Sequence, residues 1–129
     1  MTLIVCLDDK NGMLFNKRRQ SKDSVLCQKI AELAGAYLCV NAYTAKLFPG
    51  VEACSDPLVY AGDEDVCFVE DLDVTPYLEK ANRLIVYRWN RLYPADVWFP
   101  NVFESWKLVS RDEFSGSSHD LITQEVYVL

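Results

Sequence analysis

The sequence has 129 residues, of which 50% are hydrophobic, 25% charged and 12% aromatic, a composition typical of a folded globular domain rather than a disordered chain. No apolar run approaches the ~18 residues of a membrane-spanning helix, and the first residues lack a signal-peptide pattern, so we expect a cytoplasmic protein with no membrane partner. The net charge is −6, and residues 47–79 hold nine Asp or Glu and no Lys or Arg, so we expect no nucleic-acid partner.

The first third of the chain is predicted to alternate between strand and helix. Thr2–Leu7 is a short apolar run that leads into an Asn-Gly turn, which predicts a buried strand. The polar and basic residues 16–22 are predicted to form a loop. Apolar positions after Asp23 recur at helical spacing up to Gly35, so we expect a helix with Asp23 as its N-cap. Residues 36–40 then form a second apolar, strand-like run.

The rest of the chain adds strands, two short helices and a closing hairpin. Strands are predicted at 66–69, 84–89, 106–114 and 121–128, and short helices at 44–48 and 75–81. Strands that alternate with helices and end in two consecutive strands predict an α/β fold, with a mixed, mostly parallel β-sheet, a C-terminal antiparallel hairpin and a few flanking helices. We expect a single domain over residues 1–129.

The cysteines and the histidine give no sign of a metal site. The five cysteines are an odd number without C-x-x-C spacing, which favours reduced, buried thiols. His119 is the only histidine, so no metal is predicted. It follows a Ser-Gly-Ser-Ser turn, where a surface position is expected, and spacing alone reveals no Ser/His/Asp arrangement.

A family resemblance appears between residues 77 and 106. A Leu-Glu-Lys-Ala element at 78–81 leads into the strand 84–89, and Asp96, Phe99-Pro100 and Trp106 follow in order. This order resembles dihydrofolate reductases, in which such an element precedes a long strand, an acidic residue, Phe-Pro and a tryptophan that opens the next strand. The resemblance implies a dihydrofolate reductase-like fold.

The N-terminus is similar to the same family. A short buried strand, an Asn-Gly turn, a loop at 16–22 and a carboxylate at the head of the first helix, Asp23, follow in the family's order, although the interval from Gly12 to Asp23 is one residue short. With the C-terminal part, the resemblance covers about two-thirds of the chain.

The cofactor motifs of the family are largely missing. Where the family has Gly-Arg-x-Thr, residues 41–44 read Asn-Ala-Tyr-Thr, and only Thr44 is retained, as a candidate ligand-binding residue. Where it has a Gly-Gly pair, residues 69–73 read Val-Glu-Asp-Leu-Asp, which adds side chains and three carboxylates near a phosphate position. About twenty residues separate the second helix from the third strand, which implies a reduced adenosine-binding region. We therefore predict no cofactor and consider NADPH unfavourable.

The residues expected around the substrate match the family better than the cofactor motifs do. Asp23 corresponds to the family's active-site acid, which implies recognition of a pterin-like ligand and a raised pKa in a pocket lined by Val5, Leu26, Tyr87 and Phe15. With a raised pKa it could assist protonation of the substrate, so Asp23 is the candidate catalytic residue. Asp23 also suits an ordinary helix N-cap, and the family's tryptophan and proline before the acid are absent.

A basic cluster adjoins this predicted pocket. Lys17, Arg18 and Arg19, with Lys22, could hold an anionic group of a small ligand or an acidic protein partner, or could form a solvated loop. The leading hypothesis is a reductase relative that binds a small pterin-like ligand, or a protein, without NADPH. The alternatives are an oxidoreductase acting on a pterin- or flavin-like substrate with a different or weakly bound cofactor, and a structural or regulatory homo-oligomer.

Overall fold

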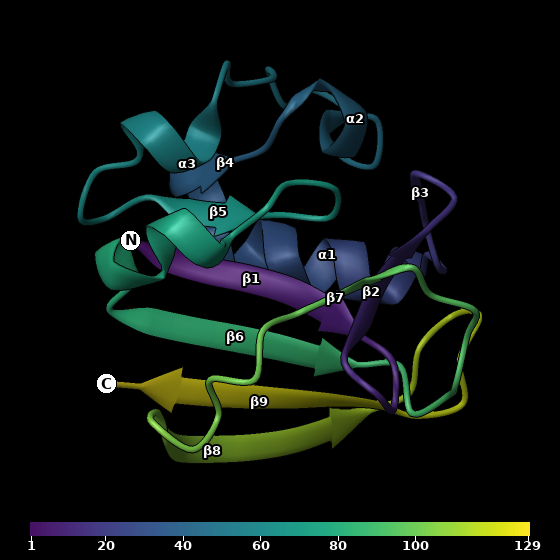
Figure 1. Cartoon of the computed structure of the whole chain (residues 1–129). Helices are drawn as coiled ribbons and strands as arrows, with labels where there is room; N and C mark the ends of the chain where they lie inside the picture. Colours follow the sequence, from purple (N-terminus) through teal and green to yellow (C-terminus); the bar gives the residue numbers. More distant parts are fainter.

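A six-stranded sheet forms the centre of the structure, a computed structural model that describes residues 1–129 (Figure 1). The strand order is β4-β5-β1-β6-β9-β8, so the first strand of the chain lies in the middle. The strands are β1 (Thr2–Leu7), β4 (Leu38–Cys39), β5 (Val66–Phe68), β6 (Arg83–Arg88), β8 (Lys107–Phe114) and β9 (Ile122–Val128).

The sheet is parallel on one side and antiparallel on the other. β4, β5, β1 and β6 run in the same direction, whereas β9 pairs antiparallel with β6 and β8 pairs antiparallel with β9. A register irregularity lies between Leu108 and Ser110 of β8. The mostly parallel sheet with a C-terminal antiparallel hairpin confirms the fold class predicted from the sequence.

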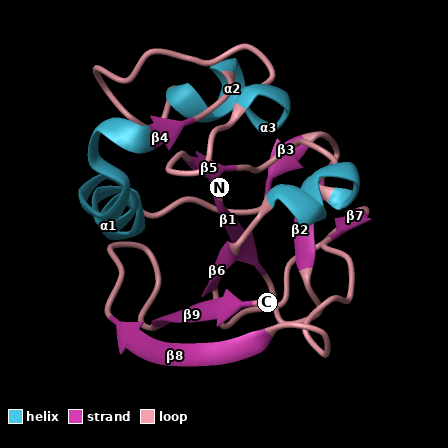
Figure 2. Ribbon diagram, turned by 90° about the vertical axis from the view of Figure 1, so that its left-hand side faces the viewer, coloured by secondary structure: helices cyan, strands magenta, loops and turns pink.

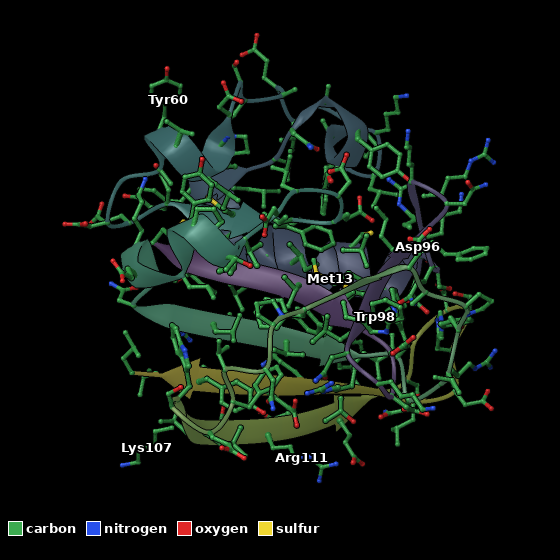
Figure 3. The ribbon with its side chains drawn as sticks, viewed as in Figure 1. Met13, Tyr60, Asp96, Trp98, Lys107 and Arg111 are labelled. Atoms are coloured by element: carbon green, nitrogen blue, oxygen red, sulfur yellow. The ribbon has the colours of Figure 1, made fainter.

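Different elements cover the two faces of the sheet (Figure 2). Helix α1 (Ser24–Ala34) packs on one face, and the 3-10 helix η2 (Thr75–Lys80) lies on the other. A small sheet of order β3-β2-β7 also lies on the second face and comprises β2 (Gly12–Phe15), β3 (Arg18–Arg19) and β7 (Val97–Trp98). Figure 3 shows Met13 of β2 over the central strands, where it is buried.

The alternation of side chains along a strand creates two separate cores. Leu3, Val5 and Leu7 of β1 belong to the core under η2 and the small sheet, whereas Ile4 belongs to the core under α1. In β6, Tyr87 likewise faces α1. The position of a residue in the strand therefore decides which of the two cores its side chain joins.

Helix α1 begins and ends as the sequence predicts. Asp23 has an extended conformation and caps the first turn, and Gly35 ends the helix with a φ of 54°, which a residue with a side chain adopts less readily. Leu26, Ile30 and Ala34 form its buried stripe. The helices of this protein are all too short or too polar to cross a bilayer.

Several shorter predictions need correction. The predicted loop at 16–22 contains β3, because Asn16 and Lys17, with φ of 51° and 62°, turn the chain back on β2 as a hairpin. The strand predicted at 36–40 is only β4, since a 3-10 turn, η1 (Gly35–Tyr37), precedes it.

The two short helices also differ from prediction. The helix predicted at 44–48 is α2 (Ala42–Ala45), which starts earlier because the Asn41 side chain caps it. The turn-rich segment at 52–65 contains one further helical turn, α3 (Pro57–Tyr60). At 75–81 the helix is of the 3-10 type.

Candidate functional site

The Asp23 carboxylate lies where α1 begins, against the turn that connects β8 to β9. Its Oδ1 accepts from the N–H groups of Val25 (3.0 Å), Leu26 (3.1 Å) and Ser117 (3.0 Å). Its Oδ2 accepts from the N–H of Ser118 (2.8 Å), and the Ser118 hydroxyl lies at 3.2 Å. The side chain is fully buried, and hydrogen-bond donors of the protein itself occupy both carboxylate oxygens.

These donors reverse the pKa expected for Asp23. Burial alone would raise the pKa, but the donated hydrogen bonds, that of the Ser117 N–H first among them, hold the pKa of the Asp23 carboxyl far below its usual range. The predicted raised pKa is therefore wrong. Gly116 permits this arrangement, because an added Cβ would collide with the Asp23 carboxylate and with Ile122.

His119 is buried in this network, which corrects the predicted surface position. Its Nδ1 lies 3.2 Å from Asp23 Oδ2, and its Nε2 lies 3.2 Å from Ser21 Oγ and 2.9 Å from the Tyr93 hydroxyl. The ring stacks on Trp89 with a centroid separation of 4.5 Å. Closure of the β8–β9 turn over β6 thus buries a residue that follows a polar turn.

A second network joins the β2–β3 hairpin to the end of β5. Arg19 Nε and Nη2 donate to the two carboxylate oxygens of Glu70 at 2.7 and 3.0 Å. The Thr44 hydroxyl also donates to Glu70 Oε1 at 2.8 Å, and the Thr44 N–H is taken by Asn41 Oδ1 at 3.0 Å. Arg19 additionally lies over the ring of Tyr43. Arg19 and Thr44 therefore meet, but on a carboxylate of the protein.

The predicted pocket wall divides between the two faces of the sheet. Val5 is buried in the core beneath η2, whereas Leu26 and Tyr87 are buried in the core beneath α1. The Tyr87 hydroxyl donates to Gln124 Oε1 at 2.8 Å, and burial raises the pKa of Tyr87. The structure does not bring Val5 to one cavity with the other two, because neighbouring strand residues alternate in direction.

The remaining predicted residues lie at the tip of the hairpin. Phe15, Lys17 and Arg18 are all exposed, and Arg19 alone turns inward. The basic cluster is thus split between the tip, which faces solvent, and a side chain that closes the hairpin onto β5.

Between these networks the strand ends leave almost no space. A cavity of only about 10 Å³ remains, lined in part by Cys6, Ser21, Glu70 and Trp89. Such a volume holds at most about one water molecule. The centre of the molecule, where three strands end, is filled by its own side chains.

A large groove lies on the outer side of α1. Its volume is about 640 Å³, and it runs between α1 and residues 46–51, with Ser117 and Ser118 at its wall. The apolar lining comes from Cys27, Ala31, Leu47, Phe48, Pro49 and Val51, and two exposed lysines, Lys22 and Lys46, also line it. This size is typical of small-molecule sites.

No group of three or more His, Cys, Asp or Glu side chains comes together as a metal site. All five cysteines are free, but only Cys67 is fully buried, so the expectation of buried thiols holds for one of them. Burial raises the pKa of Cys67 to about 11, which keeps that thiol protonated.

Sequence reasoning missed the groove and the partners of His119 and Glu70. The only available signals were the hydroxyl-rich turn before His119 and the carboxylate of Glu70 in place of a glycine. No pattern in the sequence marks the groove, because residues 46–51 lie beside α1 only once the chain has folded.

Comparison with known proteins adds the fold family. No family model matches the sequence, and no curated protein sequence does. Among solved structures, the chain is similar to the dihydrofolate reductase from Enterococcus faecalis complexed with NADP(H) and RAB-propyl, with a TM-score of 0.70 and 13% identity. The match covers 98% of this chain and 94% of that chain. The chain therefore has a dihydrofolate reductase-like fold, as the sequence resemblance implied.

Proposed function

We propose that the protein binds a small ligand in the groove beside α1 and does not carry out NADPH-dependent reduction. The observation that carries this proposal is the groove itself, with a volume of about 640 Å³, an apolar lining and two lysines. A cavity of this kind suits a flat, apolar ring system that carries one or more anionic groups. Conjugated pterins with a carboxylate tail belong to this class.

The proposal leaves Asp23 out of ligand recognition. A pterin that donates two hydrogen bonds to a carboxylate needs free acceptor positions, and both oxygens of Asp23 already accept from backbone N–H groups of the protein. The ligand instead contacts apolar side chains and Lys22 or Lys46. The helix-cap alternative for Asp23 is the one that this geometry favours.

The residues at the phosphate-facing positions do not fit NADPH. Glu70 and Asp71 replace small residues at the end of β5; Glu70 is bound by Arg19, and Asp71 accepts from Asn41 Nδ2 at 2.8 Å. A phosphate there would meet two carboxylates and would compete with Glu70 for Arg19. The Enterococcus faecalis enzyme was solved with NADP(H), so the fold can accept this cofactor, and the proposal depends on these side chains rather than on the fold.

Calorimetric titration with dihydrofolate, an antifolate and NADPH tests the proposal. We expect saturable binding of dihydrofolate or the antifolate and no heat from NADPH. Saturable NADPH binding, or NADPH oxidation coupled to the reduction of dihydrofolate, would contradict the proposal that the protein carries out no NADPH-dependent reduction. Absence of binding by both pterin-like compounds would remove that ligand class.

Two substitutions, each with a matched control, locate the binding site. Ala31→Phe places a ring in the groove and should abolish binding, whereas Ala36→Phe, also exposed but outside the groove, should not. Lys46→Glu should weaken binding of an anionic ligand about tenfold, and Lys107→Glu on β8 should leave it unchanged.

The edge strand β8 favours a second candidate, association with another copy of the chain. Its outer edge has no strand partner, and Leu108 and Val109 are 45% and 50% exposed. Lys107 and Arg111 project from the outside of this strand (Figure 3). Light scattering at increasing concentration tests this candidate, since Val109→Lys should remove any dimer. An acidic partner for the exposed Lys17–Arg18 tip stays a prediction.

A further inference from the structure

Three side chains, two from residues 21–23 and one from the distant β8–β9 connection, form one line of polar contacts. Ser21 Oγ lies 3.2 Å from His119 Nε2, and His119 Nδ1 lies 3.2 Å from Asp23 Oδ2. Ser21 follows the β2–β3 hairpin, Asp23 caps α1, and His119 lies between β8 and β9. A hydroxyl, an imidazole and a carboxylate in this order are the arrangement that activates a serine nucleophile.

The surroundings fix how the imidazole carries its proton. Nδ1 faces Asp23 Oδ2 and, at 3.1 Å, the Ser118 hydroxyl oxygen. The Ser118 hydroxyl donates to the Lys22 carbonyl at 2.7 Å, and an ionised Asp23 can only accept, so both neighbours suit a protonated Nδ1. The lone pair on Nε2 then points to the hydroxyls of Ser21 and Tyr93. Trp89 stacks on the ring and Tyr93 bonds to its edge, so the imidazole is held in place.

We propose that Ser21 is the nucleophile of an acyl-transfer site that hydrolyses small carboxylic esters, with His119 as the general base and Asp23 as a positioning residue. This activity goes beyond ligand binding in the groove and does not require it. Ser21 is partly exposed, and the cavity behind it has only about 10 Å³. The ester therefore approaches from solvent, and its acyl group stays outside this cavity.

The reaction is balanced without a cofactor. Ser21 Oγ forms a bond to the ester carbonyl carbon while its proton passes to His119 Nε2, and the departing alcohol takes that proton as the C–O bond breaks. Water then attacks the acyl-serine, gives a proton to His119 and releases the carboxylic acid, and the proton returns to Ser21.

A fluorophosphonate probe tests the nucleophile directly on the full chain. The Ser21 oxygen displaces fluoride at phosphorus, the hydroxyl proton passes through His119 to solvent, and peptide mass spectrometry locates the adduct. We expect labelling at Ser21, its loss in Ser21→Ala, and about a hundredfold slower labelling in His119→Gln. Ser24 provides the matched control, because its hydroxyl is exposed and bonds to Ser117 rather than to His119.

The pH dependence separates a base from a merely structural histidine. In the native protein the labelling rate should rise with pH as one group loses its proton, and His119→Gln should lack that rise. Equal rates in the two proteins, labelling at Ser24 instead of Ser21, or no labelling would each overturn the proposal.

One further variant covers the case in which His119→Gln fails to fold. Ser21→Cys places a thiol beside the imidazole, and iodoacetamide should modify this thiol at pH 6 at least tenfold faster than Cys27. Cys27 is a suitable reference, since it is a half-buried thiol of α1 whose pKa is raised by burial. An introduced thiol no more reactive than Cys27 would overturn the proposal. Both experiments are run without a groove ligand, because Cys27 itself lines the groove, so neither result depends on ligand binding there.

Discussion

The ends of the central strands and the groove beside α1 are built in opposite ways. At the strand ends, side chains of the protein satisfy one another, and about 10 Å³ of space remains. Beside α1, mainly apolar side chains and two lysines surround about 640 Å³, and the hydrogen bonds among the polar lining residues, such as Ser24 Oγ to Ser117 Oγ at 2.8 Å, lie at the end where α1 begins. The same fold therefore closes one region with polar contacts and leaves the adjoining one open.

This difference indicates where a ligand can gain binding energy. A ligand at the strand ends must replace hydrogen bonds that already exist, so its own contacts bring little net gain. A ligand in the groove covers apolar surface that water now contacts, and each buried Å² contributes about 25 cal/mol. The open region is the better site although the closed region holds more chemically reactive groups.

The closed region is itself held by two different networks. Around Asp23 the donors are mostly backbone N–H groups and the side chain is fully buried. Around Glu70 the main donor is a charged guanidinium, and the side chains of Arg19 and Glu70 remain 21% and 8% exposed. We expect the Asp23 network to contribute more to stability, because water screens it less.

The largest effect is expected when the Asp23 carboxylate is removed. Asp23→Ala deletes the cap of α1 and leaves the partly buried N–H groups of Ser117 and Ser118 without their acceptor. We expect a loss of about 3–4 kcal/mol in the free energy of unfolding, measured by urea titration. A loss below about 1 kcal/mol would mean that the strand-end region is not held closed from this side.

A smaller effect is expected where backbone approaches the same carboxylate. Gly116→Ala puts a Cβ into contact with the Asp23 carboxylate and Ile122, and should cost about 2 kcal/mol. Gly62→Ala is the control, because a Cβ there meets only Asp65 Oδ2, at 3.6 Å. Equal stability of the two variants would contradict the close approach at Gly116.

The comparison within the closed region predicts a still smaller effect at Arg19. Arg19→Ala leaves the Glu70 carboxylate with Thr44 as its remaining side-chain donor and should cost about 1–2 kcal/mol, less than a fully buried pair because both side chains keep some exposure. Arg18→Ala, in the same two-residue strand but exposed, should change the free energy of unfolding by less than about 0.5 kcal/mol. Equal losses would show that the ion pair does not fasten the hairpin.

The sequence contained enough local information for the fold class and for helix α1. Apolar runs marked the central strands, and Asp23 and Gly35 marked both ends of the helix because capping depends on a few neighbouring residues. The short hairpin at residues 12–19 was missed, since its turn is made by Asn16 and Lys17 at positive φ, which lysine rarely adopts.

Within the candidate site, the sequence predicted only the features that depend on a single residue. Asp23 was found, but its pKa was predicted in the wrong direction because the donors come from a turn more than 90 residues away. Val5 was placed with Leu26 because the resemblance implied one pocket around Asp23, although strand alternation sends Val5 to the other face. His119 was predicted to be exposed because its neighbours are polar, and only the paired strands show that Trp89 covers it.

The smallest predicted effect concerns pH and tests whether the Asp23 network depends on charge. The pKa of Asp23 is lower in the folded protein than the value of about 3.9 in an unfolded chain, so below pH 4 the unfolded state binds more protons. Stability should therefore be complete above about pH 5 and should fall by about 1 kcal/mol per pH unit below pH 4.

The matched variant for this pH experiment is Asp23→Asn, which keeps the shape of the side chain and cannot ionise. Asp8, whose pKa is also lowered by donors that include the Gly12 N–H, continues to lose stability in acid, so the variant should show a shallower fall rather than none. Equal slopes for the two proteins between pH 4 and pH 3 would mean that Asp23 is held by shape alone. A steeper slope in the native protein would show that the charge of Asp23 helps to keep the strand ends closed. Of the two regions compared, the groove would then remain the one that is open to a ligand.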